Sequence, residues 1–312
     1  MGGDLGDRQA IPAPRTERDR RALGSLQGLA VGDALGAPWE GSELDPARAE
    51  GPLQPSGRVA RWTDDTQMAL SVVGVLESGG TIEQDALASG FARRYQPWRG
   101  YSSATRAVLA ALRDGEPWRA LRERIFRGGS FGNGSAMRAA PIGAYFHDAP
   151  AEEVIEQADL SAAVTHSHPE GRAGAVAVAL AAWLAARSRG TGPDAGSDLL
   201  AMVADRLPPG LDVTAGLREA ARLAADAPLD AAVAALGNGS RVSCQDTVPM
   251  ALWLALHRLD DYESGVRHAV AAGGDTDTMA AIVGGIIAAR VGCAGIPEPW
   301  LSATEPVPLA EP

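Results

Sequence analysis

The chain contains no lysine: all 28 of its basic residues are arginine. This absence excludes enzymes that form a Schiff base through a lysine amine, and nucleotide hydrolases whose phosphate-binding loop needs a lysine. Cysteine is nearly absent as well, since only Cys244 and Cys293 occur, far apart in the sequence. Two such cysteines form neither a disulfide framework nor the ligand spacing of a zinc site, so we expect a cytoplasmic protein.

Positive charge and long apolar runs are also scarce. The net charge of -11 argues against general nucleic-acid binding, which depends on neutralising phosphates with a basic surface. The last long apolar run ends at Arg290, before the ~18 to 20 residues that a membrane span needs. No apolar signal core follows Met1. We expect a soluble protein without a membrane anchor.

Strand patterns, in which apolar and polar residues alternate, are almost absent. Apolar residues at helical spacing, separated by glycine and proline, predict helices over residues 19–34, 64–77, 82–95, 103–113, 117–126, 136–146, 151–164, 170–187, 197–206, 213–225, 229–236, 247–256, 262–272 and 278–291. We therefore expect an all-α fold, a compact orthogonal multi-helix bundle in which alanine lets helices pack closely. Residues 1–15 are expected to form a flexible tail, 16–306 a single domain and 307–312 a short C-terminal tail.

Two turns, one near each end of the chain, carry closely spaced aspartates before an apolar helix. In the first, Asp64 and Asp65 follow Thr63; in the second, two glycines precede Asp275 and Asp277. Either turn alone is typical of a helix N-terminus, where such side chains cap free amides. Together they favour one metal site, because divalent cations such as Mg²⁺ bind carboxylates and clustered carboxylates do not all stay ionised without a cation. We predict that the two turns converge.

A glycine-rich loop over residues 130–134 leads into one of the expected helices. Its backbone N–H groups can form a cradle for a phosphate or pyrophosphate. A plain loop with a helix cap at Asn133 or Ser135 explains the same pattern equally well. Phe131, within the loop, is placed to stack on a base, although packing in the core is the commoner fate of a phenylalanine.

Glu40 and His166 are weaker candidates when each is taken alone. Glu40 follows a glycine and proline turn, a position suited to a general base, to a metal ligand or to an ordinary surface glutamate. His166 lies in the segment Thr-His-Ser-His-Pro at residues 165–169. An active-site role and a buried structural role are equally compatible with that position.

Read together, five segments closely resemble the ADP-ribosylglycohydrolase family: residues 32–36 with Glu40, 62–66, 132–134 with Met137 and Arg138, 165–166, and 274–278. They follow the family's order and span nearly the whole chain. The family includes dinitrogenase reductase-activating glycohydrolase, the ADP-ribosylarginine and ADP-ribosylserine hydrolases, and the J1 crystallins. The resemblance implies a single all-α domain with a binuclear Mg²⁺ centre, in which Mn²⁺ is a possible substitute, at the base of a cleft.

The resemblance also assigns roles to residues of this chain. The metal ligands that it implies are Thr63, Asp64, Asp65, Asp275, Asp277 and Thr278. It implies a catalytic role for Glu40, Asp64 and Asp277. The substrate-binding residues that it implies are Ser130, Phe131, Gly132, Asn133 and Gly134, which hold the diphosphate and adenine, and His166, which lines the ribose end.

The implied activity is hydrolysis that removes ADP-ribose from a modified acceptor. We prefer N-glycosidic ADP-ribosylarginine, because residues 132–138 look most like the bacterial arginine-directed members. Hydrolysis of ADP-ribose linked to serine, to acetyl groups or to nucleic acid is an alternative. A metal-dependent phosphohydrolase and a catalytically silent, J1-crystallin-like structural or ligand-sensing protein are others. We expect a monomer whose partner is an ADP-ribosylated protein or another ADP-ribose conjugate.

Overall fold

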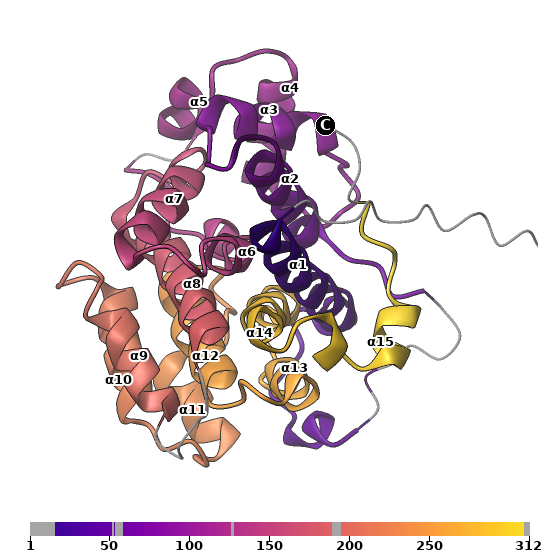
Figure 1. Cartoon of the computed structure of the whole chain (residues 1–312), viewed down its shortest axis with the longest axis vertical. Coiled ribbons are helices and arrows are strands. Elements are labelled where there is room, and N and C mark those ends of the chain that lie inside the picture. Colours follow the sequence, from indigo (N-terminus) through magenta and orange to yellow (C-terminus); the bar gives the residue numbers. More distant parts are fainter. Residues whose placement is uncertain (1–15, 52, 54–58, 126–127, 189–194, 309–312) are drawn as a thin grey trace, which may run out of the picture.

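The computed structural model describes residues 16–51, 53, 59–125, 128–188 and 195–308 (Figure 1). The expected N-terminal tail, and residues 309–312 of the expected C-terminal tail, lie outside the described residues. Over the described ranges the secondary structure is helical, and extended backbone pairs only as three isolated bridges: Ser42 with Gly274, Ala60 with Thr304, and Gly132 with Ser243. The all-α prediction is confirmed.

The helices follow the chain in an order close to the expected one. Their bounds are α1 Glu17–Gly36, α2 Asp64–Gly79, α3 Gln84–Arg94, α4 Ser103–Arg113, α5 Trp118–Ile125, α6 Ala140–Tyr145, α7 Ala151–Ala163, α8 Pro169–Arg187, α9 Ala195–Ala204, α10 Asp212–Arg222, α11 Leu229–Leu236, α12 Cys244–Leu256, α13 Tyr262–Ala271, α14 Thr276–Val291 and α15 Glu298–Ala303. Short 3₁₀ helices cover Ala37–Trp39, Pro46–Ala49, Asn133–Ser135 and Cys293–Gly295.

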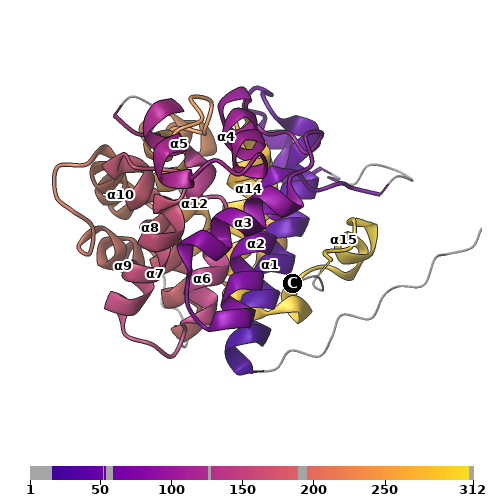
Figure 2. The same cartoon turned by 90° about the horizontal axis from the view of Figure 1, so that it is seen from above.

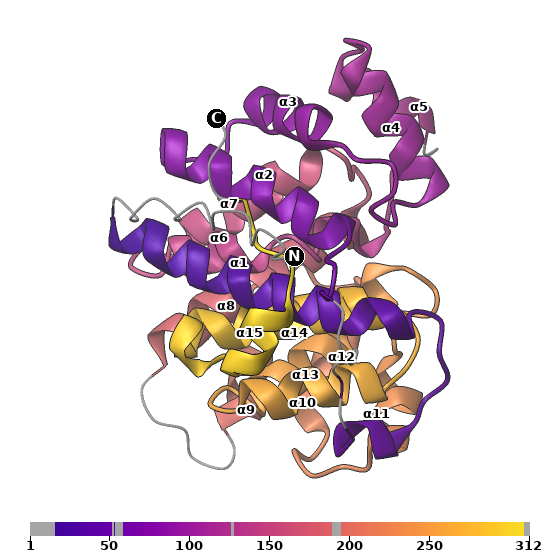
Figure 3. The same cartoon turned by 90° about the vertical axis from the view of Figure 1, so that its right-hand side faces the viewer.

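Helix α14 is the centre of the molecule. Its residues from Thr276 to Ala289 are all buried, and α1, α6, α8, α12 and α13 pack around it (Figures 1 and 2). A helix that is apolar on every side has no solvent face and belongs in the core of a protein of this size. Helices α2 to α5 lie at one end of this arrangement, and α9 to α11 lie at the edge formed by α8 and α12 (Figure 3).

Helices α1 and α14 approach each other unusually closely because α1 carries glycines four residues apart. A Cβ atom placed on Gly32 would lie 2.1 Å from the carbonyl oxygen of Ala280, and one on Gly36 would lie 2.3 Å from that of Thr276. Real Cβ atoms do not approach a backbone oxygen this closely. Glycine at these positions therefore sets the separation of the two helices, which carry Asp33 and Asp277 at the same end.

Three details differ from the sequence predictions. Helix α6 begins at Ala140 rather than at residue 136, because Asn133–Ser135 forms a separate 3₁₀ turn. Helix α1 spans Glu17–Gly36 rather than residues 19–34, and its last glycine contacts α14. Helix α15 was not expected. None of the described helices combines the length and apolar character that crossing a bilayer requires.

Candidate metal centre and substrate cleft

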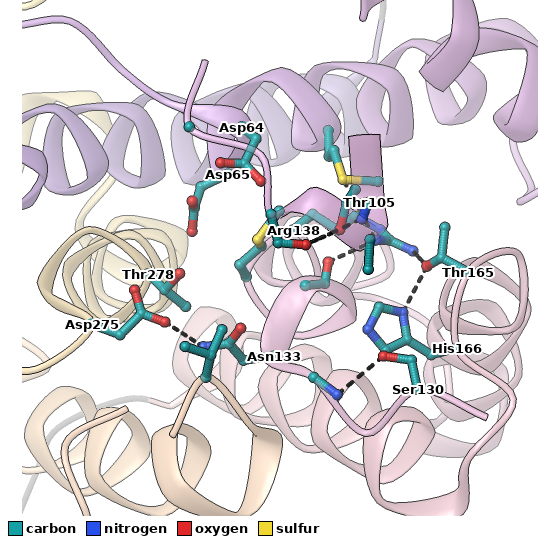
Figure 4. A pocket seen from close by; sticks show the side chains of 18 of the residues that line it. Asp64, Asp65, Thr105, Ser130, Asn133, Arg138, Thr165, His166, Asp275 and Thr278 are labelled. Carbon is teal, nitrogen blue, oxygen red and sulfur yellow. Dashed lines mark hydrogen bonds between the residues drawn. The ribbon is translucent and has the colours of Figure 1, made fainter. Parts of the chain in front are cut away.

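A cleft of about 400 Å³ opens beside the N-terminal ends of α2 and α14. Its walls come from those two ends, from α4, from the glycine-rich loop before α6, and from the turn before α8 (Figure 4). The sequence-predicted residues that line it are Glu40, Asp64, Asp65, Ser130, Phe131, Gly132, Asn133, Gly134, His166, Asp275, Asp277 and Thr278. Thr63 does not line it. The structure thus brings both acidic turns and the glycine-rich loop to one place.

Carboxylates gather in two overlapping groups at the acidic end of the cleft. Oxygen atoms of Asp33, Asp65 and Asp277 lie within 4.8 Å of one another, and so do oxygen atoms of Glu40, Asp275 and Asp277. Asp277 belongs to both groups. Each group could hold a metal ion, and a shared carboxylate would place two ions side by side.

Glu40 reaches this cluster although its side chain is exposed. It follows the 3₁₀ turn Ala37–Trp39, and the chain beyond it pairs with the second acidic turn. Gly41 donates its N–H to the carbonyl oxygen of Gly274 at 2.8 Å, and Gly274 donates to that of Ser42 at 2.9 Å. This two-bond bridge holds Glu40 beside Asp275.

Asp33, to which the sequence analysis assigned no role, supports the first acidic turn. Its carboxylate accepts bonds from the backbone N–H of Thr63 at 2.9 Å and from that of Thr66 at 3.1 Å. It also accepts from the Thr63 hydroxyl at 2.9 Å and from the Thr66 hydroxyl at 2.6 Å. Asp33 is fully buried and lies 30 residues before the turn that it holds. Because its lone pairs are directed at these donors, Asp33 supports the first acidic turn and has little capacity left to bind a metal ion.

The acidic turns do begin helices, but their aspartates do not act as ordinary caps. Thr63 and Asp275 are the N-cap residues of α2 and α14, and neither side chain makes a capping hydrogen bond. The Oδ1 atom of Asp65 is buried and has no hydrogen-bond partner among the described residues. An ionised oxygen is costly to bury without a partner. The donor set, all oxygen and mostly carboxylate, fits a hard divalent cation at this position.

Electrostatics lead to the same conclusion. Burial, with the charge of Asp277 adding to it, raises the pKa of Asp33 to about 7, against the hydrogen bonds from Thr66 and Thr63. Burial also holds the pKa values of Asp64, Asp65 and Asp277 well above the ordinary range, and the neighbouring carboxylates raise them further. Burial and mutual repulsion thus favour the protonated carboxyl groups over the ionised ones, and a cation would relieve both effects.

The glycine-rich loop is attached directly to the second acidic turn. Asn133 is buried and donates from its amide nitrogen to Asp275 at 2.6 Å and to the Thr247 hydroxyl at 3.0 Å (Figure 4). Both amide protons of Asn133 therefore bond protein atoms. Asn133 links the loop to the acidic turn, a contact between residues 142 apart that no local pattern predicts.

The rest of the loop is held by α8 and by the start of α12. Cys244 donates its N–H to the Phe131 carbonyl at 3.0 Å, beside the antiparallel bridge between Gly132 and Ser243. The Ser130 hydroxyl accepts from the N–H of Gly132 at 3.3 Å. The Phe131 ring is 49% exposed and meets His168 edge to face at 5.5 Å, which leaves one of its faces available at the cleft mouth.

His166 lies beneath this loop and is buried. Burial, with the charge of Arg138 adding to it, lowers the pKa of His166 to about 3, and the Gly132 backbone opposes the shift. The ring is therefore neutral at every physiological pH. Arg138 and Thr165 also line the cleft, and the sequence analysis gave neither a role.

Comparison with known proteins identifies the family to which this combination of fold and cleft belongs. A family model described as ADP-ribosylglycohydrolase matches residues 14–311. The chain belongs to the ADP-ribosylglycohydrolase family. The acidic end of the cleft, the glycine-rich loop and His166 all fall inside the matched range.

Similar proteins cover nearly the whole of this ADP-ribosylglycohydrolase. A relative from Archaeoglobus fulgidus, named only as an uncharacterised protein, is 36% identical over 294 residues, which are 88% of each chain. ADP-ribosylhydrolase ARH3 of Danio rerio is 28% identical and covers 93% of this chain and 88% of its own. The same protein of Homo sapiens is 28% identical, with 91% and 89% covered. A solved structure named as an ADP-ribosylglycohydrolase-related protein complex matches with a TM-score of 0.66 and 29% identity over 93% of each chain.

Proposed function

We propose that this ADP-ribosylglycohydrolase is a binuclear Mg²⁺-dependent enzyme that releases ADP-ribose from a modified acceptor, with N-glycosidic ADP-ribosylarginine as the preferred linkage. Membership of the family makes it a hydrolase of ADP-ribosylated substrates. The observation that carries the proposal is the meeting of the two acidic turns in one cleft, where Asp64 and Asp65 lie with Asp275 and Asp277 and the glycine-rich loop forms another wall. Mn²⁺ is the expected substitute, because it takes the same oxygen ligands.

The residues that would hold the two ions are Thr63, Asp64, Asp65, Asp275, Asp277 and Thr278. When bound, the ions would supply positive charge that fixes the ribose hydroxyls and makes a bound water more acidic. Asp33 takes no part as a ligand in this proposal, because its carboxylate oxygens already accept from Thr63 and Thr66.

The protein itself would bind the substrate and move the proton. Backbone N–H groups of residues 130–134 hold the diphosphate, Phe131 covers the adenine, and His166 contacts the ribose. Glu40 takes a proton from the attacking water as the new C–O bond forms at the anomeric carbon, and that proton passes to the departing acceptor as its bond to the carbon breaks. Its place supports this role, because Glu40 is the exposed member of the cluster and its carboxylate lies within 4.8 Å of Asp275 and Asp277.

A release assay over a panel of conjugates tests the activity and its linkage together. ADP-ribose attached to arginine, to serine, to an acetyl group and to an oligonucleotide end is incubated with the enzyme, with and without Mg²⁺. We expect Mg²⁺-dependent release of free ADP-ribose, fastest from the arginine conjugate. Release from another conjugate alone would reassign the linkage. Release of inorganic phosphate from free nucleotides would indicate a phosphohydrolase instead.

A pair of matched variants tests the acidic cluster in the same assay. Asp277→Asn removes the shared carboxylate with almost no change of shape, and we expect turnover to fall at least 100-fold. Asp226→Asn changes an exposed aspartate outside the cleft and should leave turnover unchanged. Full activity in Asp277→Asn would contradict the binuclear centre. Failure of the unmodified enzyme to bind either metal or ADP-ribose would favour a silent, structural protein.

A further inference from the structure

Arg138 is a buried cation that the proposed function leaves without a task. Its side chain is 0% exposed, and no carboxylate pairs with it among the described residues. Nη1 donates to the Gly134 carbonyl at 2.6 Å, and Nη2 donates to the Ser161 carbonyl at 3.0 Å. Nη2 also donates to the Thr165 hydroxyl at 3.0 Å. Burying a charge without an ion-pair partner costs free energy, so a buried arginine of this kind calls for an explanation.

The hydrogen bond from Arg138 to Thr165 bears on which nitrogen of the neighbouring His166 ring carries the proton. A guanidinium group only donates hydrogen bonds, so the Thr165 oxygen is the acceptor in the contact with Arg138. The hydroxyl proton of Thr165 is then free to point the other way, toward the Nδ1 atom of His166 at 2.7 Å (Figure 4). When the hydroxyl donates in this way, Nδ1 is the acceptor, and because the neutral ring carries one N–H, its own proton is then on Nε2.

The Nε2 atom faces the glycine-rich loop. Cβ atoms placed on Gly132 and Gly134 would lie 3.7 and 3.8 Å from Nε2, which is ordinary van der Waals contact, so the loop lies directly against this nitrogen. His166 lines the cleft, and the backbone of Gly132 is a hydrogen-bond partner of its ring. The Nε2 edge of the ring therefore lies where the glycine-rich loop borders the cleft, within reach of a ligand bound there.

We propose that Arg138 and Thr165 are positioning residues that hold His166 in the Nε2–H tautomer, so that its ring presents one fixed, neutral donor to an oxygen of ADP-ribose. This inference rests on the proposed function for the identity of the ligand. It extends that function by assigning the ring a donor role and excluding it as a proton acceptor at Nε2. The same guanidinium also donates to the Gly134 carbonyl. One side chain, Arg138, therefore holds both the glycine-rich loop and the threonine that contacts His166.

Burial of His166 keeps its ring in the neutral form. The low pKa of His166 prevents a second proton on the ring, and a protonated Nδ1 would meet the Thr165 hydroxyl as a competing donor. A neutral donor suits a ribose hydroxyl or a phosphate oxygen and adds no charge of its own. The ring would therefore help to orient bound ADP-ribose without adding charge to the cleft.

The first test is spectroscopic and uses the unmodified enzyme. Nitrogen chemical shifts of the His166 ring, in protein labelled with ¹⁵N-histidine and assigned with a His166→Gln variant, report which nitrogen carries the proton. We expect the proton on Nε2 in the metal-free and metal-loaded protein. A proton on Nδ1 would overturn the inference whether or not the enzyme hydrolyses any conjugate.

The second test separates positioning from packing through Thr165. Thr165→Val keeps the shape and removes the hydroxyl, whereas Thr165→Ser restores it. We expect the valine variant to show a mixed tautomer and an ADP-ribose Kd about tenfold higher by calorimetry, and the serine variant to recover both values. Thr214→Val is the matched control, because Thr214 is equally buried but its hydroxyl bonds the Pro208 carbonyl, away from the cleft.

The outcomes distinguish this inference from the proposed function. A valine variant that retains the Nε2 proton and normal ADP-ribose affinity contradicts the positioning role even if the enzyme is an active hydrolase. A tautomer that changes in Thr165→Val and recovers in Thr165→Ser supports it even if the preferred acceptor proves not to be arginine. Arg138→Met is the more direct change, but removing a fully buried arginine endangers the fold.

Discussion

At the scale of single residues, Asp33 shows how a site depends on a side chain that does not touch the ligand. Its carboxylate accepts from two backbone amides and two hydroxyls of the first acidic turn. The Thr63 hydroxyl that it holds lies 3.0 Å from Asp65. Asp33 thus sets the direction of an expected ligand, and groups of this kind tune metal affinity strongly.

We expect Asp33→Asn to weaken metal binding more than it weakens the fold. The amide keeps one acceptor oxygen but directs an NH₂ group at donors of residues 63 and 66, so the turn must shift. Affinity for Mn²⁺, measured by calorimetry, should fall about 10- to 100-fold. Asp19→Asn, which alters a capping carboxylate at the far end of the same helix, is the control and should leave the affinity unchanged. Equal affinities in the two variants would refute the support role.

The raised carboxyl pKa values also predict a pH dependence of stability. A carboxyl group whose folded pKa lies above its unfolded value holds a proton in the folded state that the unfolded chain releases. Its contribution to stability is therefore complete below the unfolded pKa of 3.8 and is lost as pH rises through the folded pKa, which is about 7 for Asp33. Asp64, Asp65 and Asp277 shift in the same direction.

After chelation of divalent metal, the free energy of unfolding should accordingly decrease as pH rises from about 4 to about 7, the interval between the unfolded and folded pKa values of Asp33. Urea denaturation at several pH values, followed by circular dichroism, measures the decrease. Saturating Mg²⁺ should remove most of it, because a bound cation replaces the protons. A metal-free stability that rises steadily over this range would show that the carboxylates do not share the cluster in solution.

At the scale of elements, the contact between α1 and α14 positions the acidic groups. The glycines of α1 allow backbone-to-backbone contact, and side chains cross-link it. Ser25 donates to the Gly285 carbonyl at 2.8 Å, Thr276 to that of Gly36 at 2.9 Å, and Tyr262 to that of Gly28 at 2.6 Å. A change in the helix separation would move Asp33 relative to Asp277.

Gly32→Ala should therefore damage both stability and metal binding. The new methyl group would lie 2.1 Å from the Ala280 carbonyl oxygen, and we expect a loss of about 3 kcal/mol in the free energy of unfolding. Gly79→Ala is the same substitution at a helical glycine with nothing within 4 Å, and it should be neutral or slightly stabilising. Denaturation midpoints of the two variants give the comparison. Similar values would mean that α1 and α14 are farther apart than described.

Much of this architecture could be predicted from local patterns. Apolar spacing with glycine and proline boundaries places most helices within a few residues, because those signals act over one or two turns. The short α15 lacks such a periodic signal, and the 3₁₀ turn at Asn133–Ser135 depends on a bond from Asn133 to Asp275. Asp33, Arg138 and Thr165 were missed for the same reason: their partners lie far away in the sequence.

At the scale of the whole molecule, the C-terminal segment of the described chain supports the first acidic turn. Glu305 donates its N–H to the Ala60 carbonyl at 2.8 Å, and its carboxylate pairs with Arg99 at 2.7 Å. Arg99 in turn donates to the Trp62 carbonyl at 2.8 Å and covers the Trp62 ring. The segment after α15 thus contacts the residues that precede Asp64 on the outer side of the molecule, while α14 lies on the core side.

A fragment that ends at residue 274 should consequently bind no divalent metal, although it keeps α1 to α13. It retains Asp33, Asp64 and Asp65 but lacks Asp275, Asp277 and the central helix. Calorimetry with Mn²⁺, on the fragment alone and after addition of a synthetic peptide of residues 275–308, tests this. Recovery of binding on addition of the peptide would show that the missing segment completes the centre, and binding by the fragment alone would refute a site shared by both turns.

The position of α14 near the end of the chain also has a consequence for biosynthesis. While the ribosome is still adding residues up to Gly274, the aspartates of the first turn are already synthesised but have no opposite half. The nascent polypeptide would therefore stay catalytically silent until α14 has left the exit tunnel. Activity would then appear in one late step, when the last core helix inserts among those already made.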